Sequence, residues 1–270
     1  MTDMPITWIR KDESSLAEEL KDRNLAHANE IQSLVSPVDS FYTRYTKRVL
    51  DIVISGAALV VTAPINVVLA AITLRDVGSP ILYKQQRVGL HGKPFTLIKF
   101  RNMTNEKDAN GEPLPPSQRV TKTGKVIRKY SLDELLNFWS VFKGDMSIIG
   151  PRPLPVQYCE RLSNRHFQRH EIRPGLLCPI RDEFRERYPF PEPYSTYQAQ
   201  FETEVWYVEH AGFVTDLKML GLLFKATFDM KSRSRNAGSA SPFIGYDEDG
   251  FAISRKYFED SKDDGTGDDK

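Results

Sequence analysis

The sequence predicts an α+β protein that is held at a membrane by one apolar segment. Three observations lead to this prediction: an uncharged run over residues 52–74, two β-prone runs around a glycine-containing turn within residues 81–100, and an amphipathic helical pattern that begins at Ser131. The predicted fold is a monotopic membrane protein with an N-terminal reentrant helix-break-helix. A β-hairpin and amphipathic interfacial helices are expected around a small cytosolic domain.

The composition excludes several classes of protein. Hydrophobic residues make up 40% and charged residues 27% of the 270 residues, which argues against a disordered chain and against a polytopic membrane protein. The net charge of +1 lacks the basic excess typical of nucleic-acid binding, so no nucleic-acid partner is expected. The two cysteines, Cys159 and Cys178, are too few for a disulfide framework and fit a reducing, cytosol-facing compartment.

The chain divides into four segments. Residues 1–43 are predicted to form a polar, partly helical extension, and residues 44–76 the membrane segment. Residues 77–235 are predicted to form the cytosolic domain, and residues 236–270 a C-terminal extension. The end of this extension is acidic and contains glycine, so it is expected to be disordered.

The run from Ile52 to Leu74 is the membrane candidate. Its 23 residues, at about 1.5 Å per residue, would cross a bilayer core of about 30 Å. Pro64 removes a backbone donor in the middle of the run and disfavours helical geometry at Ala63, while Asn66 adds a polar side chain. The helix is therefore expected to break or kink at Pro64.

Basic residues flank the membrane candidate on both sides. Arg44, Lys47 and Arg48 precede it, and a series of lysines and arginines that begins at Arg75 follows it. Basic flanks stay on the cytosolic side of a membrane, so both ends are expected there. This symmetry favours a hairpin that dips into one leaflet, and an ordinary kinked transmembrane helix is the alternative.

Three further elements are predicted from local patterns. Residues 81–88 and 95–100 are β-prone and enclose a glycine-containing turn, which indicates a hairpin. Residues 104–119 are rich in proline and polar residues and are expected to form a loop. Residues 213–228 form an apolar helical stretch, which could lie in the core or along the membrane surface.

A helix is predicted to begin at Ser131. Ser131 and Glu134 have the spacing of a capping box, and Lys143-Gly144 supplies a stop signal. The apolar residues that follow fall on one helical face: Leu132, Leu135, Leu136, Trp139 and Phe142.

Asp133 and Glu134 are adjacent carboxylates in the first turn of this predicted helix. A helix N-terminus would keep Asp133 ionised and could hold a phosphate beside it, so Asp133 could attack phosphorus. Glu134 could bind Mg²⁺, which takes one or two carboxylates together with phosphate oxygens and water. The alternative is purely structural, because a capping box and the helix dipole explain both residues without catalysis.

Several cations could bind phosphate near these carboxylates. Arg128 precedes them, and Arg152 lies between two prolines that present it from a stiff loop. Lys99 and Arg101 alternate on a predicted strand, where a solvated strand face is the alternative. Arg173-Pro174-Gly175 is a similar rigid turn. By contrast, His166, His170 and Cys178 lack the neighbours of a metal or thiol site and are expected to be structural.

Assembled in order, these pieces resemble the bacterial sugar transferases, the monotopic phosphoglycosyl transferases that act on a polyprenyl carrier. The resemblance covers residues 44–230 and consists of several motifs in one order, which makes it specific. These motifs are Lys47-Arg48-Val49-Leu50-Asp51, Gly89-Leu90-His91-Gly92-Lys93, Lys99-Phe100-Arg101, Ser131-Leu132-Asp133-Glu134-Leu135, Lys143-Gly144-Asp145-Met146-Ser147, Gly150-Pro151-Arg152-Pro153, Arg173-Pro174-Gly175 and Val205-Trp206-Tyr207-Val208.

The resemblance implies a two-step transfer of a sugar-1-phosphate. Asp133 would attack the sugar-bearing phosphorus of a nucleotide diphosphate sugar, with UDP as the expected nucleotide, and polyprenyl phosphate would then accept the phosphosugar. Glu134 would coordinate Mg²⁺, while Arg128, Arg152 and Lys99 would balance phosphate charge. The implied location is the bacterial inner membrane with the catalytic domain facing the cytosol, where a homodimer could form. The alternative is a non-catalytic membrane scaffold of the same fold that binds carrier lipid or glycan-assembly partners.

The sequence departs from the family pattern in two places. Family members usually have Ser-Pro at the helix break, whereas this chain has Ala63-Pro64, so Thr62 is the hydroxyl that could substitute. After Arg173-Pro174-Gly175 the family continues with Thr-Gly, whereas residues 176–181 here read Leu-Leu-Cys-Pro-Ile-Arg. Sugar or nucleotide recognition could therefore differ at this second position.

Overall fold

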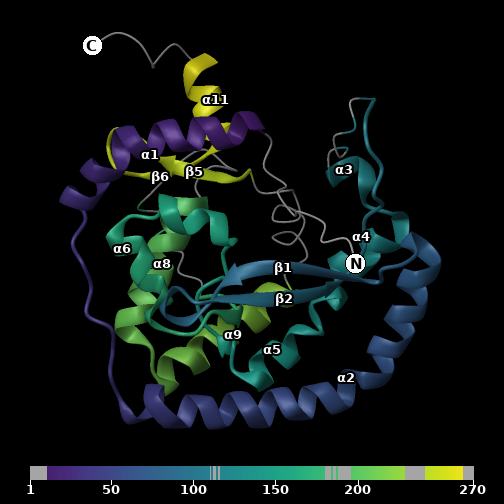
Figure 1. The fold of residues 1–270 in the computed structure, drawn as a ribbon. Coiled ribbons are helices and arrows are strands. Elements are labelled where there is room, and N and C mark those ends of the chain that lie inside the picture. The colour runs from purple at the N-terminus through teal and green to yellow at the C-terminus, as the bar shows by residue number, and fades with distance from the viewer. Residues whose placement is uncertain are drawn as a thin grey trace.

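The computed structural model describes residues 11–109, 111, 114, 116–179, 184, 187, 196–228 and 241–263. Helices and short strands are mixed, which confirms the predicted α+β class. Figure 1 shows a long helix, α2, along one side of the molecule, and α1 with β5, β6 and α11 on the opposite side. The acidic end from residue 264 onward lies outside the described residues.

The helices alternate with short strands along the chain. The α-helices are α1 Lys11–Ile31, α2 Lys47–Val77, α3 Pro116–Arg119, α4 Lys122–Lys129, α5 Asn137–Lys143, α6 Asn164–Phe167, α8 Thr196–His210, α9 Phe213–Phe228 and α11 Arg255–Asp263. The π-helical turn η1 is Tyr42–Thr46, and the 3₁₀ turns are η2 Leu90–Gly92, η3 Leu132–Glu134, η4 Val156–Arg161 and η5 Gln168–Glu171.

The strands form three separate two-stranded sheets within the described part of the chain. β1 Leu82–Val88 pairs antiparallel with β2 Pro94–Phe100, which confirms the predicted hairpin. β3 Ser147–Ile149 pairs in parallel with β4 Gly175–Leu177, and β5 Phe243–Tyr246 pairs antiparallel with β6 Ala252–Ser254. The hairpin turn is closed by Gly89 N, which donates to Lys93 O at 2.8 Å.

The membrane candidate is one continuous helix. Pro64 lies inside α2 without ending it, so the predicted break of the helical element was wrong. Within the described residues, one helical stretch, Tyr42–Val77, is long and apolar enough to cross a membrane. The ribbon of α2 bends partway along its length (Figure 1), as expected where a proline removes one intrahelical hydrogen bond.

Thr62 does not replace the hydrogen bond that Pro64 removes. The missing N–H would have bonded to the carbonyl four residues earlier, that of Val60. The Thr62 hydroxyl instead donates to Ala58 O at 2.7 Å. Thr62 was predicted to supply the hydroxyl that Ala63 lacks, but its hydroxyl does not reach the carbonyl that Pro64 leaves free.

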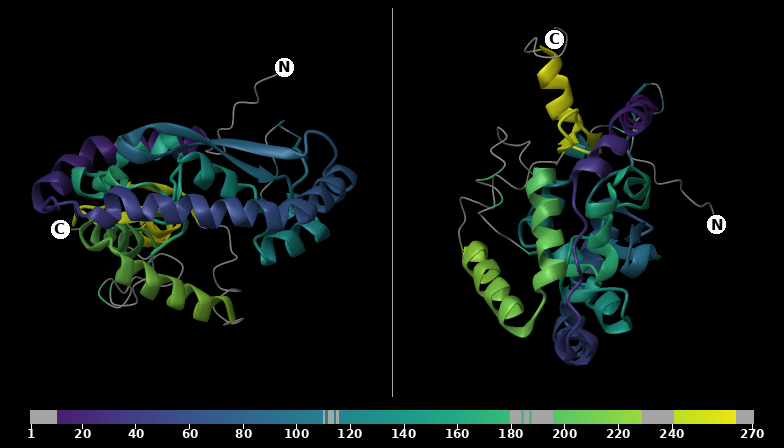
Figure 2. Two further views of the ribbon diagram at one scale, coloured as in Figure 1. Left: turned by 90° about the horizontal axis from the view of Figure 1, so that it is seen from below. Right: turned by 90° about the vertical axis from the view of Figure 1, so that its left-hand side faces the viewer.

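Both ends of α2 are attached to the same body. At its start, the Asp51 carboxylate accepts hydrogen bonds from Ile148 N at 2.9 Å and Ser147 Oγ at 3.0 Å. Toward its end, Leu69 packs with Phe100 and Ile127 in a common apolar cluster. The helix therefore lies across the body, as the view from below in Figure 2 also shows.

The outer face of α2 is strongly apolar and exposed. Val60 is 76% exposed, and large aliphatic side chains along most of the helix are also exposed: Val53, Val61, Val67, Val68 and Leu74. The apolar helix α9 buries Met219 in the core but exposes Phe213, Val214 and Leu217. One face of α9 thus packs in the core, and the location of its exposed apolar face along the membrane surface stays a prediction.

The two chain extensions pack together. α1 contributes Ala17 and Leu20 to an apolar cluster with Ile244 of β5 and Ile253 of β6. Asn24 donates to Tyr246 O at 2.8 Å, which fixes the helix against the strand. These contacts hold the helical part of residues 1–43 against the C-terminal strands.

We expect Asp51→Ala to destabilise the protein by about 2 kcal/mol or more, because two buried donors lose their acceptor. The thermal midpoint of the purified protein in detergent should fall by several degrees. Asp22→Ala on the exposed face of α1 is the matched control and should leave the midpoint unchanged. Equal midpoints for both variants would contradict the anchoring role of Asp51.

Candidate active site

The turn that carries the two carboxylates is not the predicted helix N-terminus. Ser131 has a left-handed conformation (φ 53°, ψ 30°), and its side chain caps no backbone group among the described residues, so the predicted capping box was wrong. Asp133 and Glu134 lie in the 3₁₀ turn η3, and α5 begins later, at Asn137. The reason is packing, since three leucines of this segment contact the cluster under α2: Leu132, Leu135 and Leu136.

The predicted end of this helix is confirmed. Gly144 follows α5 in the left-handed conformation with φ 104°, where a residue with a Cβ would be strained. The helix α5 has seven residues and starts after the two carboxylates. Its dipole therefore cannot keep Asp133 ionised in the way that the sequence predicted. Neighbouring side chains must do so.

Asp133 is held by a short chain of hydrogen bonds. Its carboxylate is buried, and Asn102 Nδ2 donates to Asp133 Oδ2 at 3.0 Å. Arg128 Nε donates in turn to Asn102 Oδ1 at 2.9 Å. Arg128 thereby orients the amide that orients the carboxylate. Asn102 was missed by the sequence reasoning, although it directly follows the Lys99-Phe100-Arg101 motif.

Glu134 forms an ion pair with Lys99. Lys99 Nζ from the end of β2 contacts Glu134 Oε1, and both side chains are partly exposed. The strand therefore brings one of its predicted cations to the carboxylate pair. Arg101 does not join it, because β2 ends at Phe100 and the buried Arg101 donates to Pro80 O at 2.8 Å.

The two adjacent carboxylates have opposite pKa shifts. Burial raises the pKa of Asp133, the negative charge of Glu134 raises it further, and the charges of Lys99 and Arg128 oppose this. Burial also acts to raise the pKa of Glu134, but Lys99, Arg152 and Arg87 together bring it below the ordinary value. The neighbouring cations therefore compensate the charge of Glu134 more fully than that of Asp133, whose pKa lies above its ordinary value.

Arg152 is fixed in place by a buried ion pair from other elements. Its backbone N–H donates to Glu204 Oε1 at 2.9 Å, and Arg169 Nη2 donates to Arg152 O at 2.6 Å. Arg169 and Glu204 form an ion pair in which both side chains are almost fully buried. The Arg152 side chain itself remains exposed and close enough to Glu134 to stabilise its charge. Sequence gave no signal for this support, since its partners are far apart along the chain.

The candidate site thus unites five of the predicted residues: Lys99, Arg128, Asp133, Glu134 and Arg152. Arg173 lies elsewhere, with Nε donating to Gly144 O at 3.0 Å beside the start of α2. Arg87 of β1, one of the basic residues that follow the membrane candidate, donates to Pro153 O at 2.8 Å and supports the Arg152 loop.

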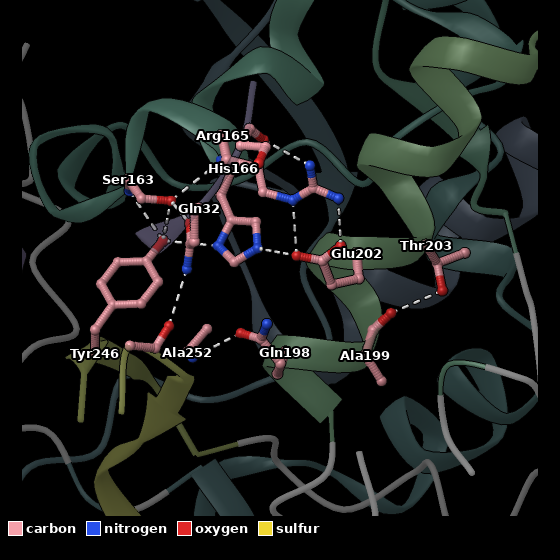
Figure 3. Close-up of polar contacts among 12 residues, drawn as sticks. Gln32, Ser163, Arg165, His166, Gln198, Ala199, Glu202, Thr203, Tyr246 and Ala252 are labelled. Atoms are coloured by element: carbon pink, nitrogen blue, oxygen red, sulfur yellow. Dashed lines mark hydrogen bonds and ion pairs between the residues drawn. The ribbon is translucent and has the colours of Figure 1, made fainter. Parts of the chain in front are cut away.

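His166 and His170 are buried away from these carboxylates. His166 Nδ1 lies 2.8 Å from Tyr246 Oη and Nε2 lies 3.0 Å from Glu202 Oε1 (Figure 3). His170 is also buried. Among the described residues, no group of three or more His, Cys, Asp or Glu side chains could hold a metal ion. A divalent ion at Asp133 and Glu134 would therefore depend on ligands from substrate.

Comparison with known proteins supports the family resemblance that the motifs indicate. The chain is 42% identical over 176 residues to an uncharacterized sugar transferase, EpsL, of Bacillus subtilis, covering 65% of this chain and 84% of that protein. It is 33% identical over 179 residues to the UDP-N-acetylgalactosamine-undecaprenyl-phosphate N-acetylgalactosaminephosphotransferase of Aeromonas hydrophila, covering 64% of this chain and 41% of that protein.

A third relative is the UDP-glucose:undecaprenyl-phosphate glucose-1-phosphate transferase of Klebsiella pneumoniae. It is 38% identical over 135 residues, which cover 48% of this chain and 29% of that protein. The matched part thus spans less than half of the length of the last two relatives. Residues 42–230, which include every residue of the candidate site, match the family of bacterial sugar transferases. The chain therefore belongs to the bacterial sugar transferase family.

Proposed function

We propose that this protein transfers a sugar-1-phosphate from a nucleotide diphosphate sugar to polyprenyl phosphate through a phosphosugar ester on Asp133. The observation that carries the proposal is the buried Asp133 carboxylate, oriented by Asn102 and Arg128 beside the Lys99–Glu134 ion pair. The relatives in Aeromonas and Klebsiella, named for UDP-sugar donors and undecaprenyl phosphate, support the substrate classes.

In the first step, an Asp133 carboxylate oxygen attacks the sugar-bearing phosphorus. A new phosphorus–oxygen bond forms, and the bond to the leaving nucleoside monophosphate breaks with its electron pair. In the second step, an oxygen of polyprenyl phosphate attacks the same phosphorus, which restores the Asp133 carboxylate. The raised pKa of Asp133 suits this role, because a more basic carboxylate is the better nucleophile.

The cations have distinct tasks in this mechanism. Arg152 is exposed and fixed through its backbone, so its guanidinium can meet the donor phosphates without reorganisation. Lys99 compensates Glu134 and can share its charge with a phosphate oxygen as negative charge redistributes. Arg128 acts through Asn102 and keeps Asp133 in position.

The donor set fits Mg²⁺. Mg²⁺ binds through one or two carboxylates plus substrate phosphates and waters, and Glu134 with its neighbour Asp133 offers such a partial set. Glu134 would hold the ion, which would supply charge neutralisation at the diphosphate.

We further propose that α2 enters one leaflet of the bacterial inner membrane and returns, with the catalytic domain on the cytosolic side. Both ends of α2 contact the same body, through Asp51 at the start and Leu69 farther on, which supports a helix lying in one leaflet. Near its end, Thr121 of the loop before α4 also donates to Asp76. A straight crossing would separate these contacts by the full bilayer thickness of about 30 Å.

The purified full-length protein, given a panel of UDP-sugars with polyprenyl phosphate and Mg²⁺, should release UMP. Asp133→Asn should lower this rate by at least about 10³-fold, because an amide cannot act as the nucleophile. Intact-mass measurement should detect a phosphosugar adduct on the unmodified protein and none on this variant. Asp22→Asn on α1 is the matched control. An adduct on the Asp133→Asn variant would assign the nucleophile elsewhere, and inactivity across the panel would favour the scaffold.

Asn102→Asp should shift the acid limb of the pH–rate profile to higher pH. A second carboxylate beside Asp133 disfavours its ionised form and raises its pKa further, so the active form is reached at higher pH. Asn102→Ala should lower kcat and shift the acid limb less, because it removes a hydrogen-bond donor to Asp133 but adds no negative charge. The profile of kcat/KM against pH tests both variants, and identical profiles for Asn102→Asp and the unmodified protein would argue against contact with the nucleophile.

Cysteine labelling tests the membrane arrangement. In a chain with Cys159 and Cys178 replaced by serine, Tyr45→Cys and Ser79→Cys place exposed thiols before and after α2. We expect both to resist a membrane-impermeant maleimide in intact cells and to react after lysis. Labelling of either position from outside would indicate a transmembrane helix.

A further inference from the structure

A row of apolar side chains leads from the carboxylates of the candidate site along α5. The backbone of η3 and α5 is one continuous helical run, because the two residues between them also have helical dihedral angles. Side chains spaced three residues apart lie in one row along such a run. Asp133 begins this row, and Leu136, Trp139 and Phe142 continue it. These last three residues are called the apolar row below, and the proposed chemistry uses none of them.

The apolar row lies against the membrane helix at both of its ends. Leu136 packs in the cluster that contains Leu69 of α2. The Phe142 ring lies 3.4 Å from the position that a Cβ would occupy on Gly56 of α2. The helix α5 therefore runs beside α2, as Figure 1 shows, and Trp139 lies between these two contacts in the row.

The two aromatic rings of the row are exposed. Trp139 is 51% and Phe142 is 39% exposed, and the rings stack with their centroids 6.0 Å apart and an interplanar angle of 25°. The opposite face of α5 supplies the packing, because Phe138 and the fully buried Val141 belong to the central apolar cluster. The outer faces of the two rings are therefore left for a ligand or for lipid.

The proposed acceptor joins a phosphate to a long isoprenoid chain. Its phosphate must reach Asp133, while its chain must stay on apolar surface that is continuous with α2. Trp139 is six residues and Phe142 nine residues from Asp133, which correspond to about 9 Å and about 14 Å along a helix. An extended chain that starts at Asp133 would thus pass over both rings before it reaches α2.

The other helix next to the carboxylates offers no such surface. The helix α4 ends just before η3, and it exposes Lys122, Lys125 and Lys129. An isoprenoid chain laid on this face would take charged groups out of water, which is costly. The apolar chain is therefore expected on α5 and not on α4.

We propose that the apolar row binds the first isoprene units of polyprenyl phosphate, with Trp139 as the main contact. This inference rests on the acceptor class proposed above and assigns the place where that acceptor lies. An indole ring suits the task, because it offers a large apolar face and loses little conformational freedom when it is covered.

Photolabelling of the full-length protein in neutral detergent tests the site without any donor. The probe is farnesyl phosphate with a diazirine on its first isoprene unit. After irradiation, peptide mass mapping should place the label within residues 137–143. Excess polyprenyl phosphate should suppress the label, whereas excess phosphatidylglycerol should not. Stronger labelling of α4 or α9, or equal suppression by both lipids, would overturn the assignment.

Kinetics of variants test the role of the ring. Trp139→Ala should raise the KM for polyprenyl phosphate about tenfold and change the KM for the UDP-sugar less than about twofold, as expected when a central aromatic contact of one ligand is removed. Trp139→Phe keeps a ring and should restore most of the affinity. Phe213→Ala is the matched control, because Phe213 is an exposed aromatic residue that contacts Tyr42 before the start of α2.

The outcomes separate this inference from the proposed reaction. Equal increases in the KM for Trp139→Ala and Phe213→Ala would indicate a general contact with the bilayer and would overturn the acceptor site. Labelling of α5 in a protein that never releases UMP would contradict the reaction but not the site. Release of UMP without labelling of α5 would contradict the site alone.

Discussion

The attachment of both ends of α2 to one body is the constraint on which the rest of the structure depends. A helix of 31 residues would extend about 46 Å if straight, yet its start bonds to Ile148 and its later turns pack on Phe100. The body therefore lies along the helix, and its exposed aliphatic face points away from the core. Phe100 is next to Lys99 in β2. The packing of α2 on Phe100 therefore also fixes the end of β2, where Lys99 pairs with Glu134.

The candidate site depends on an unequal distribution of positive charge. Lys99, Arg152 and Arg87 together lower the pKa of Glu134, whereas for Asp133 burial and the charge of Glu134 outweigh Lys99 and Arg128. Burial without full compensation raises the basicity of a carboxylate, and hydrogen bonding restricts its orientation. The arrangement thus yields one carboxylate suited to hold charge and one suited to attack, although they are neighbours in sequence.

The residues outside the family match are part of the same folded body. Gln32 of the segment after α1 donates to Gly250 O at 2.9 Å and accepts from Ser163, whose backbone N–H donates to Tyr246 Oη at 2.9 Å (Figure 3). His166 links Tyr246 to Glu202 of α8 in the same network. The extensions therefore stabilise the segment that carries Arg169, and Arg169 in turn supports the Arg152 loop.

The sequence by itself determined the family, the α+β class, the hairpin, the apolar segment and the glycine stop after α5, because these depend on composition, periodicity and motif order. It could not place Arg101 or Arg173, since strand alternation stops where β2 ends and a rigid turn can face any direction. It also predicted a capping box at Ser131, which the packing of Leu132, Leu135 and Leu136 overrode. Only the tertiary structure decided which amide meets Asp133 and which cations meet Glu134. The reason is that these contacts join distant segments of the chain: Arg152 and Glu204, for example, are 52 residues apart. Local sequence patterns carry no information about such pairings.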